Sequence, residues 1–175
     1  MIITLSGKPG SGKSSIAKII AQKLKYEFFS AGDYRGEIAL KHNITIDQLN
    51  EIGKKEFWTD KEVDDKLKSL SKQNNLVVDG WLSCYFIKNS KKIFLDVKLN
   101  EAAKRIFKDQ RPDEEKKETV KEVEKMLKNR LDQTKKRYKK YYHIDFTNEK
   151  YYDLIIDTTD LTKKQVIEKI LSFCK

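Results

Sequence analysis

The sequence predicts an α/β fold, a three-layer sandwich with a parallel five-stranded sheet between layers of helices. Two observations support this prediction. Short apolar runs alternate with amphipathic segments along the whole chain, and this alternation is typical of parallel sheets built from strand–helix–strand units. In addition, a glycine-rich segment at residues 7–12 joins the first apolar run directly to the first amphipathic segment, so the chain turns sharply there from strand to helix.

The first half of the chain is expected to form three strands and four helices. The strands are short runs rich in aliphatic and aromatic residues, at residues 2–6, 26–29 and 76–79. In the first helix, isoleucine and leucine recur at steps of three and four, the spacing of one helix face. The four helices are expected at residues 14–25, 34–40, 45–55 and 60–72.

The second half is expected to add two strands and three helices. The strands are residues 92–97 and 154–157. The helices are expected at residues 100–108, within 113–142 and at 162–173. Pro112 is expected to break the chain before the second of these helices, and Thr162 is expected to cap the last one.

Residues 113–142 form a long, highly charged segment with one narrow apolar stripe. The members of the stripe recur at steps of three and four, as on one face of a helix. They are Val120, Val123, Leu127, Leu131, Thr134, Tyr138 and Tyr141. A helix that packs along so narrow a stripe often moves. The segment therefore reads either as half of a lid or as a salt-bridged surface helix.

Length and composition indicate a single globular domain that favours anionic ligands. The chain has 175 residues, which is long enough to bury its own core. Its net charge of +10 favours the binding of anions. Lysine supplies 32 of the 37 basic residues, which fits charge spread over solvated faces better than a nucleic-acid patch. Cys84 and Cys174 are far apart and indicate neither a disulfide framework nor a metal site.

The same features predict a cytoplasmic protein, which we expect to be a monomer. The first expected strand begins at Ile2, leaving no room for a signal or transit peptide. No apolar stretch approaches the length needed to cross a membrane. The two isolated cysteines fit a reducing compartment.

Residues 7–15 carry the strongest functional signal, the pattern of a phosphate-binding loop. Gly-x-x-x-x-Gly-Lys-Ser stands between an expected strand and an expected helix, which is the context of this loop. Its glycines let successive amides curl around a phosphate, while Lys13 supplies a cation and Ser14 a hydroxyl for Mg²⁺. The expected phosphate-binding residues are Gly7, Lys8, Pro9, Gly10, Ser11, Gly12, Lys13, Ser14 and Ser15. A glycine-rich turn without a ligand is the alternative.

Two aspartates follow expected strands. Asp79 ends an apolar run directly before Gly80, so a parallel sheet would bring its carboxylate beside the phosphate loop. There it would hold Mg²⁺ through water or orient a nucleophile; a turn residue at a strand end is the alternative. Asp33 reads equally well as the cap of the helix that follows and as a substrate contact.

The five arginines are the second set of candidates. In a chain whose usual cation is lysine, arginine is expected where a planar fork of donors must match phosphate oxygens. The five are Arg35, Arg105, Arg111, Arg130 and Arg137. Arg130 and Arg137 are seven residues apart, so they share a helix face at a separation of about 10.5 Å along the axis. The alternative is that all five are ordinary surface cations.

With these motifs, the chain resembles the nucleoside monophosphate kinases of the P-loop kinase superfamily, and more narrowly the archaeal-type cytidylate kinases. The resemblance covers nearly the full length, through residues 7–15, 26–35, 77–80, 92–105, 130–145 and 152–158. It implies the P-loop NTPase form of the sandwich, with a helical acceptor-binding segment at residues 34–73 and a lid with its long helix at residues 105–142. It also implies transfer of the γ-phosphoryl group of ATP to CMP or dCMP with Mg²⁺, involving nucleotides as small-molecule partners and neither nucleic acid nor membrane.

The resemblance also implies roles for individual residues. The catalytic residues would be Lys13, Asp79, Arg130 and Arg137, and the metal would lie at Ser14 and Asp79. The ATP side would add Arg105, Arg111, Asp157 and Thr158 to the loop, with Arg130 and Arg137 closing on the transferred group from the same lid side. The acceptor side would comprise Ser30, Gly32, Asp33, Arg35 and Trp81.

Two features of the acceptor side stay open. The family often has an arginine where this chain has Trp81, so Trp81 either packs against a base or fills core. Within the acceptor-binding segment, four acidic residues lie close together in the chain, Asp60, Glu62, Asp64 and Asp65. They read as solvated helix charge, and the alternative is that one of them accepts a hydrogen bond from a base amine.

The acceptor and the function class have alternatives. The sequence leaves CMP, dCMP, UMP and AMP open, and another small P-loop kinase, such as an adenylate kinase or a dephospho-coenzyme A kinase, would share the loop. From other classes, the charge suggests a nucleotide-dependent nucleic-acid-binding factor, and the loop alone would suit a nucleotide switch. The sequence lacks the aromatic–basic pattern of a single-strand binding platform, which disfavours the nucleic-acid reading.

Overall fold

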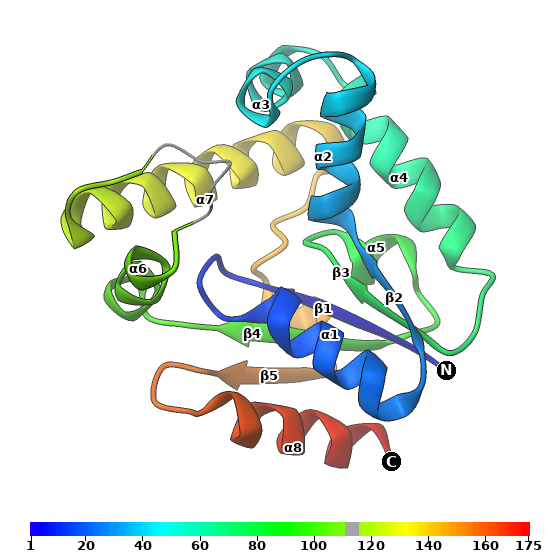
Figure 1. Ribbon diagram of the computed structural model, residues 1–175. Coiled ribbons are helices and arrows are strands. Elements are labelled where there is room, and N and C mark those ends of the chain that lie inside the picture. Colours follow the sequence, from blue (N-terminus) through cyan, green and yellow to red (C-terminus); the bar gives the residue numbers. More distant parts are fainter. Residues whose placement is uncertain (111–115) are drawn as a thin grey trace.

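The computed structural model describes residues 1–110 and 116–175, which form a five-stranded sheet with helices on both faces (Figure 1). The strands are β1 (Ile2–Gly7), β2 (Glu27–Ser30), β3 (Leu76–Asp79), β4 (Lys91–Asp96) and β5 (Leu154–Asp157). Their order is β2-β3-β1-β4-β5, and every neighbouring pair is parallel. The predicted α/β fold with its parallel sheet is confirmed.

The sheet is buried on both faces, which explains why its strands are almost continuously apolar. On one face, Ile3 and Leu5 pack with residues of α1 (Lys13–Leu24) and α8 (Lys163–Cys174). On the other face, Ile2 and Val78 pack with Leu67 of α4 (Trp58–Leu70). The alternating side-chain directions of the strands thus give the three predicted layers.

The other helices lie mainly above the C-terminal edge of the sheet. They are α2 (Ala31–Lys41), α3 (Ile46–Lys55), α5 (Ser83–Phe86), α6 (Leu99–Lys108), α7 (Val120–Tyr142) and the 3₁₀ turn η1 (Glu149–Tyr151). Figure 1 shows α7 crossing the molecule from α6 to the group formed by α2, α3 and α4. With 23 residues, α7 is about 34 Å long, so its two ends lie in different parts of the molecule.

Capping residues fix where several helices begin. Thr162 caps α8 as predicted, and its side chain and that of Gln165 form a reciprocal capping box. Thr119 and Glu122 do the same at the start of α7, so this helix begins at Val120. The expected break at Pro112 and the first residues of the predicted segment lie outside the described part of the chain.

The cap interpretation of Asp33 is wrong. The helix expected at residues 34–40 begins earlier, at Ala31, because the Ser30 hydroxyl accepts a hydrogen bond from the Asp33 amide, 3.1 Å between O and N. Asp33 therefore lies inside the first turn, with its exposed carboxylate 3.9 Å from the Lys18 ammonium. The short elements α5 and η1 were not predicted, because three or four residues carry no periodicity.

Over the described ranges, every helix is too short or too polar to span a bilayer.

Candidate active site

The parallel strands bring the predicted site residues to one edge of the sheet. Ser30 at the end of β2 lies opposite Asp79 at the end of β3, and Asp79 lies opposite Leu5 of β1. The phosphate loop leaves β1 two residues later. In open α/β sheets, ligands bind in the crevice beyond the carboxyl ends of the strands, so this edge is the candidate site.

The phosphate loop requires glycine where its backbone passes close to neighbouring elements. Gly10 has φ 78°, and a Cβ there would lie 2.7 Å from Cβ of Ala102 in α6. At Gly7 a Cβ would lie only 2.2 Å from the carbonyl oxygen of Leu95 in β4. The loop then enters α1, which has no side-chain cap at Gly12. The first-turn amides and the helix dipole are thus oriented toward an anion.

The polar side chains of the loop fit a nucleotide phosphate and its metal. Lys13 Nζ donates to the Lys8 carbonyl oxygen at 3.2 Å, which holds the ammonium over the loop. Among the described residues, the buried Ser11 hydroxyl lacks a hydrogen-bond partner. Lys8 itself pairs with Asp96 at the end of β4, 2.6 Å between Nζ and Oδ1. These contacts leave a cradle of positive charge at the start of α1.

Ser14 and Asp79 form the candidate magnesium site. The Ser14 hydroxyl donates a hydrogen bond to the buried carboxylate of Asp79, so two oxygen ligands meet beside the loop as predicted. In the described ranges, no group of three or more His, Cys, Asp and Glu side chains is arranged to hold a metal ion. This suits Mg²⁺, which takes few protein ligands and completes its shell with water and substrate phosphates.

A second charged cluster lies between α2, α4 and α7, where Arg35 and Arg137 share the carboxylate of Asp60. Arg35 Nη1 is 3.2 Å from Asp60 Oδ1, and Arg137 Nε is 3.3 Å from Oδ2. The side chains of both arginines are only 12% exposed and that of Asp60 is 6% exposed. Arg35 is further fixed by Asn50, whose Oδ1 accepts from Nε at 3.1 Å.

The cluster has more positive than negative charge. Burial and the neighbouring Arg137 lower the pKa of Arg35, and burial raises the pKa of Asp60 against the opposing effect of the two arginines. Among the described residues, Asp60 Oδ2 and Arg137 Nε are buried without hydrogen-bond geometry to any partner. Two guanidinium groups around one carboxylate therefore leave a net positive charge that favours a further anion.

A glycine makes room for this cluster. A Cβ at Gly53 of α3 would lie 3.0 Å from Arg35 Nη2 and 3.3 Å from Arg137 Nη1. The two guanidinium groups thus meet against the bare backbone of α3, which belongs to the predicted acceptor-binding segment.

Asp64, one turn after Asp60 in α4, forms a separate buried pair with α7. The Tyr142 hydroxyl donates to Asp64 Oδ2 at 2.6 Å. Burial, more than any other cause, raises the pKa of Asp64 to about 6, and the negative charge of Asp60 adds to the rise. The hydrogen bond from Tyr142 and the charge of Lys68 oppose it. Asp60 and Asp64 are therefore not the solvated helix charges that the sequence suggested.

We expect Asp64→Asn to stabilise the protein near pH 7.5 but not near pH 4. A free aspartate has a pKa near 3.9, so the folded state holds this proton more tightly, and its contribution to stability is lost as the pH rises through about 6. A shift of about two pKa units corresponds to up to about 3 kcal/mol. Asparagine keeps an acceptor for Tyr142 without the charge. Urea unfolding at both pH values measures the difference.

Asp65→Asn is the matched control, because Asp65 is exposed and pairs with Lys61 and Lys68 at the surface. It should leave the free energy of unfolding nearly unchanged at both pH values, because exposed ion pairs contribute little to stability. Equal stability of Asp64→Asn and the wild type at pH 7.5 would contradict the assignment.

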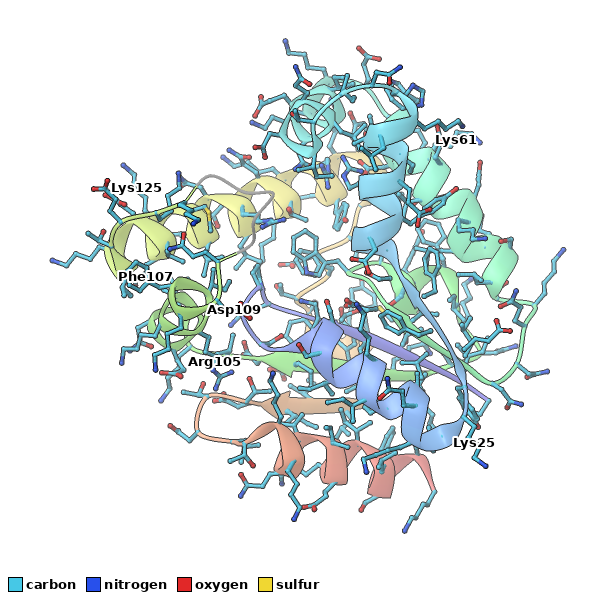
Figure 2. All side chains as sticks on the ribbon, in the orientation of Figure 1. Lys25, Lys61, Arg105, Phe107, Asp109 and Lys125 are labelled. Carbon is cyan, nitrogen blue, oxygen red and sulfur yellow. The ribbon has the colours of Figure 1, made fainter. Side chains whose placement is uncertain are left out.

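Arg105 lies at the other end of the site, against the loop between β5 and α8. Its Nη2 donates to the carbonyl oxygens of Thr158 at 2.7 Å and Thr159 at 2.9 Å, and its Nε contacts Glu101 at 3.2 Å. Figure 2 shows it between α6 and that loop. Thr158 is buried, and its hydroxyl donates to the Asp96 carbonyl oxygen at 2.8 Å. Arg105 is thus brought together with Asp157 and Thr158, the other residues predicted for the ATP side.

The arginines do not form the single lid group that the resemblance implied. Arg137 lies near the C-terminal end of α7, against Asp60 and Arg35 of the acceptor-binding segment, because α7 is long enough to carry its two ends apart. Arg130 is half-buried two turns earlier on the same helix. Arg111 lies outside the described residues.

The indole N–H of Trp81 forms a hydrogen bond within the protein. Its indole Nε1 donates to the Gly7 carbonyl oxygen at 2.8 Å, and its ring stacks on Phe146 with 5.3 Å between centroids.

Ser30 and Gly32 lie at the start of α2, where the Ser30 hydroxyl serves as the helix cap. No sequence signal indicated the bond between Trp81 and Gly7. For Asp60 and Asp64 a signal was present: they are four residues apart, about one helical turn, so they lie on the same face of α4.

Comparisons with known proteins identify the family of this chain. The model of the cytidylate kinase-like family matches residues 2–160. A cytidylate kinase from Archaeoglobus fulgidus is 37% identical over 98% of this chain and 93% of its own length. A shikimate kinase structure from Bacteroides thetaiotaomicron has a TM-score of 0.69 at 18% identity, covering 99% of this chain and 98% of that one. This last likeness shows the fold, which is that of P-loop kinases.

One relative is much longer than this chain. An S-adenosylmethionine-dependent nucleotide dehydratase from Lacinutrix mariniflava is 38% identical over 97% of this chain, yet the match spans only 35% of that protein. The archaeal relative, in contrast, matches along nearly its full length. The family model and the archaeal relative show that this protein belongs to the cytidylate kinase-like family and is a phosphotransferase of the nucleoside monophosphate kinase type.

Proposed function

We propose that the protein transfers the γ-phosphoryl group of ATP to CMP or dCMP, giving ADP and the cytidine diphosphate. The observation that supports this proposal is the presence of two separate clusters of positively charged side chains. One is the phosphate loop with Lys13 at the start of α1, and the other is the pair Arg35 and Arg137 above the same edge of the sheet. A kinase that transfers a phosphoryl group between two phosphorylated substrates needs one such cluster for each substrate.

The donor would bind on the loop side. Residues 10–15 would hold the ATP phosphates, Ser14 and Asp79 would hold Mg²⁺ directly or through water, and the loop at Asp157 and Thr158 would lie near the donor base. Bound Mg²⁺ neutralises charge on phosphate oxygens. Lys13 would offset the charge that remains on the β- and γ-phosphates.

The acceptor would bind on the side of residues 34–73, with its phosphate at Arg35 and Arg137. Its phosphate is already ionised, so the reaction needs no strong general base. The main obstacle is repulsion between two anions, which preorganised guanidinium and ammonium groups offset. Residues 105–142 would close over both substrates and exclude water, which would otherwise hydrolyse ATP.

An acceptor screen tests this proposal. ADP formation from ATP and Mg²⁺ is measured with CMP, dCMP, UMP, AMP, GMP and dephospho-coenzyme A offered singly, and with cytidine as the acceptor that lacks a phosphate. We expect CMP or dCMP to exceed the others by at least about tenfold in kcat/KM, since one base contact is worth about 1–3 kcal/mol.

The other outcomes are informative. Preference for AMP would support the same mechanism with a different acceptor. Activity with cytidine would contradict a role for Arg35 and Arg137 in binding the acceptor phosphate. Turnover that does not depend on any acceptor would contradict the kinase proposal. Salt-sensitive binding to nucleic acid would then become the next measurement.

A further inference from the structure

Trp81 holds the first residue of the phosphate loop. Its indole N–H donates to the Gly7 carbonyl oxygen at 2.8 Å. On the other side of Gly7, the Lys8 amide donates to the Leu95 carbonyl oxygen at 3.1 Å, and the close approach of Leu95 excludes a side chain at Gly7. The loop is therefore fixed at its origin between β4 and a single side chain that follows β3.

The ring of Trp81 contacts the helix that carries Arg137. It meets Tyr138 edge-on, with 6.4 Å between centroids and an interplanar angle of 76°, and it stacks on Phe146 at 5.3 Å and 28°. Tyr138 and Phe146 are both buried and contact each other. The side chain of Trp81 thus fills the space between the phosphate loop and the C-terminal part of α7.

Arg137 extends this contact to the charged cluster with Arg35 and Asp60. Its guanidinium lies over the Tyr138 ring at 5.3 Å from the centroid, and its Nε is 3.3 Å from Asp60. Continuous contacts therefore run from Asp60 through Arg137, Tyr138 and Trp81 to Gly7. An anion that binds Arg137 competes with Asp60 for it, so its binding acts directly on one end of this path.

Core filling alone does not account for the indole. A phenylalanine would supply the same stacking against Phe146, but it would lack the donor that reaches Gly7. Because that donor is engaged inside the protein, Trp81 does not offer it to a nucleotide base.

On the basis of the proposed function, we propose that Trp81 is a positioning residue that links binding of the acceptor phosphate at Arg35 and Arg137 to the position of the phosphate loop. Acceptor and donor would then each bind more tightly in the presence of the other. Coupling between two sites is reciprocal and is typically about 5- to 150-fold in affinity.

Trp81→Phe tests this proposal, because it removes only the indole N–H and part of the ring. The dissociation constant of a non-hydrolysable ATP analogue with Mg²⁺ is measured without and with saturating CMP. In the wild type we expect CMP to tighten the analogue by at least about fivefold. In Trp81→Phe this ratio should fall to near one, while the affinity for CMP alone changes by less than about threefold.

Trp58→Phe is the matched control. Trp58 is the other tryptophan of the chain, and its indole N–H donates to the side chain of Glu56 at 2.9 Å in an exposed contact. This variant should keep the wild-type ratio. It also leaves Trp81 as the sole tryptophan, so its fluorescence reports on this position without any change at Trp81 itself. CMP alone should then alter the emission of Trp81.

Two results would overturn the proposal while leaving the kinase function intact. One is a coupling ratio in Trp81→Phe equal to that of the wild type, and the other is Trp81 emission that does not respond to CMP in Trp58→Phe. The fluorescence result decides the matter even if Trp81→Phe does not fold. Failure of the proposed function would show differently, as a wild-type protein without acceptor-dependent ADP formation.

Discussion

Lys13→Ala will abolish phosphoryl transfer and leave the fold intact. Lys13 is half-buried at the first position of α1, where its ammonium is held over the phosphate loop by the Lys8 carbonyl oxygen. Its charge lies where negative charge has to be offset during transfer, and removal of one such preorganised group costs at least about 100-fold in kcat. Core residues of α1 such as Ile16 and Ile20 are unaffected, so the melting temperature should change by only a few degrees.

The measurement is ADP formation with CMP together with thermal unfolding. Lys23→Ala is the control, because Lys23 lies in the last turn of the same helix and is exposed; it should retain full activity. Undiminished turnover in Lys13→Ala would contradict the assignment of the loop as the ATP site.

Arg137→Lys is expected to lower kcat/KM for the acceptor by about 100-fold, or about 2.7 kcal/mol. Lysine keeps a positive charge opposite Asp60 but lacks the planar fork that engages a carboxylate and a phosphate together. Since lysine keeps a cation and Arg35 still pairs with Asp60 at 3.2 Å, no buried carboxylate is left unpaired, and the loss in free energy of unfolding should stay below the loss in transition-state stabilisation. The rate loss should thus exceed the stability loss.

Steady-state kinetics and urea unfolding of the same preparation separate the two effects. Lys136→Ala is the control, since Lys136 is the exposed neighbour of Arg137 on α7. Losses of similar size in activity and stability would assign Arg137 a structural role instead of a role at the acceptor phosphate.

The fold could be predicted well because its signals are local. The central strands β1 and β3 are short apolar runs that the parallel sheet buries on both faces, and Thr162 marks the start of α8 by a capping pattern within four residues. Helix starts were missed where the cap lay in the preceding strand, as at Ser30 and Ala31. The short helix α5 offered too few residues for any pattern.

In the candidate site, too, the features that are local in sequence could be predicted and those that depend on tertiary packing could not. The phosphate loop is contiguous, so its residues and the neighbouring Asp79 were placed from sequence and lie together in the structure. The cluster of Arg35, Asp60 and Arg137 unites three helices that are far apart in the chain. The sequence identifies these three residues only as charged. Their burial and their pairing with one another depend on where the C-terminal end of α7 lies. The hydrogen bond from Trp81 to Gly7 likewise depends on tertiary packing alone.

The most direct test of the central claim follows the phosphoryl group itself. ATP labelled in its γ-phosphate is incubated with Mg²⁺, CMP and the wild-type protein, and the labelled products are separated. We expect the label to appear in CDP, in amounts equal to the ADP formed, and we expect Lys13→Ala to transfer none. Label released only as inorganic phosphate, or left in ATP whatever acceptor is offered, would contradict phosphoryl transfer to CMP.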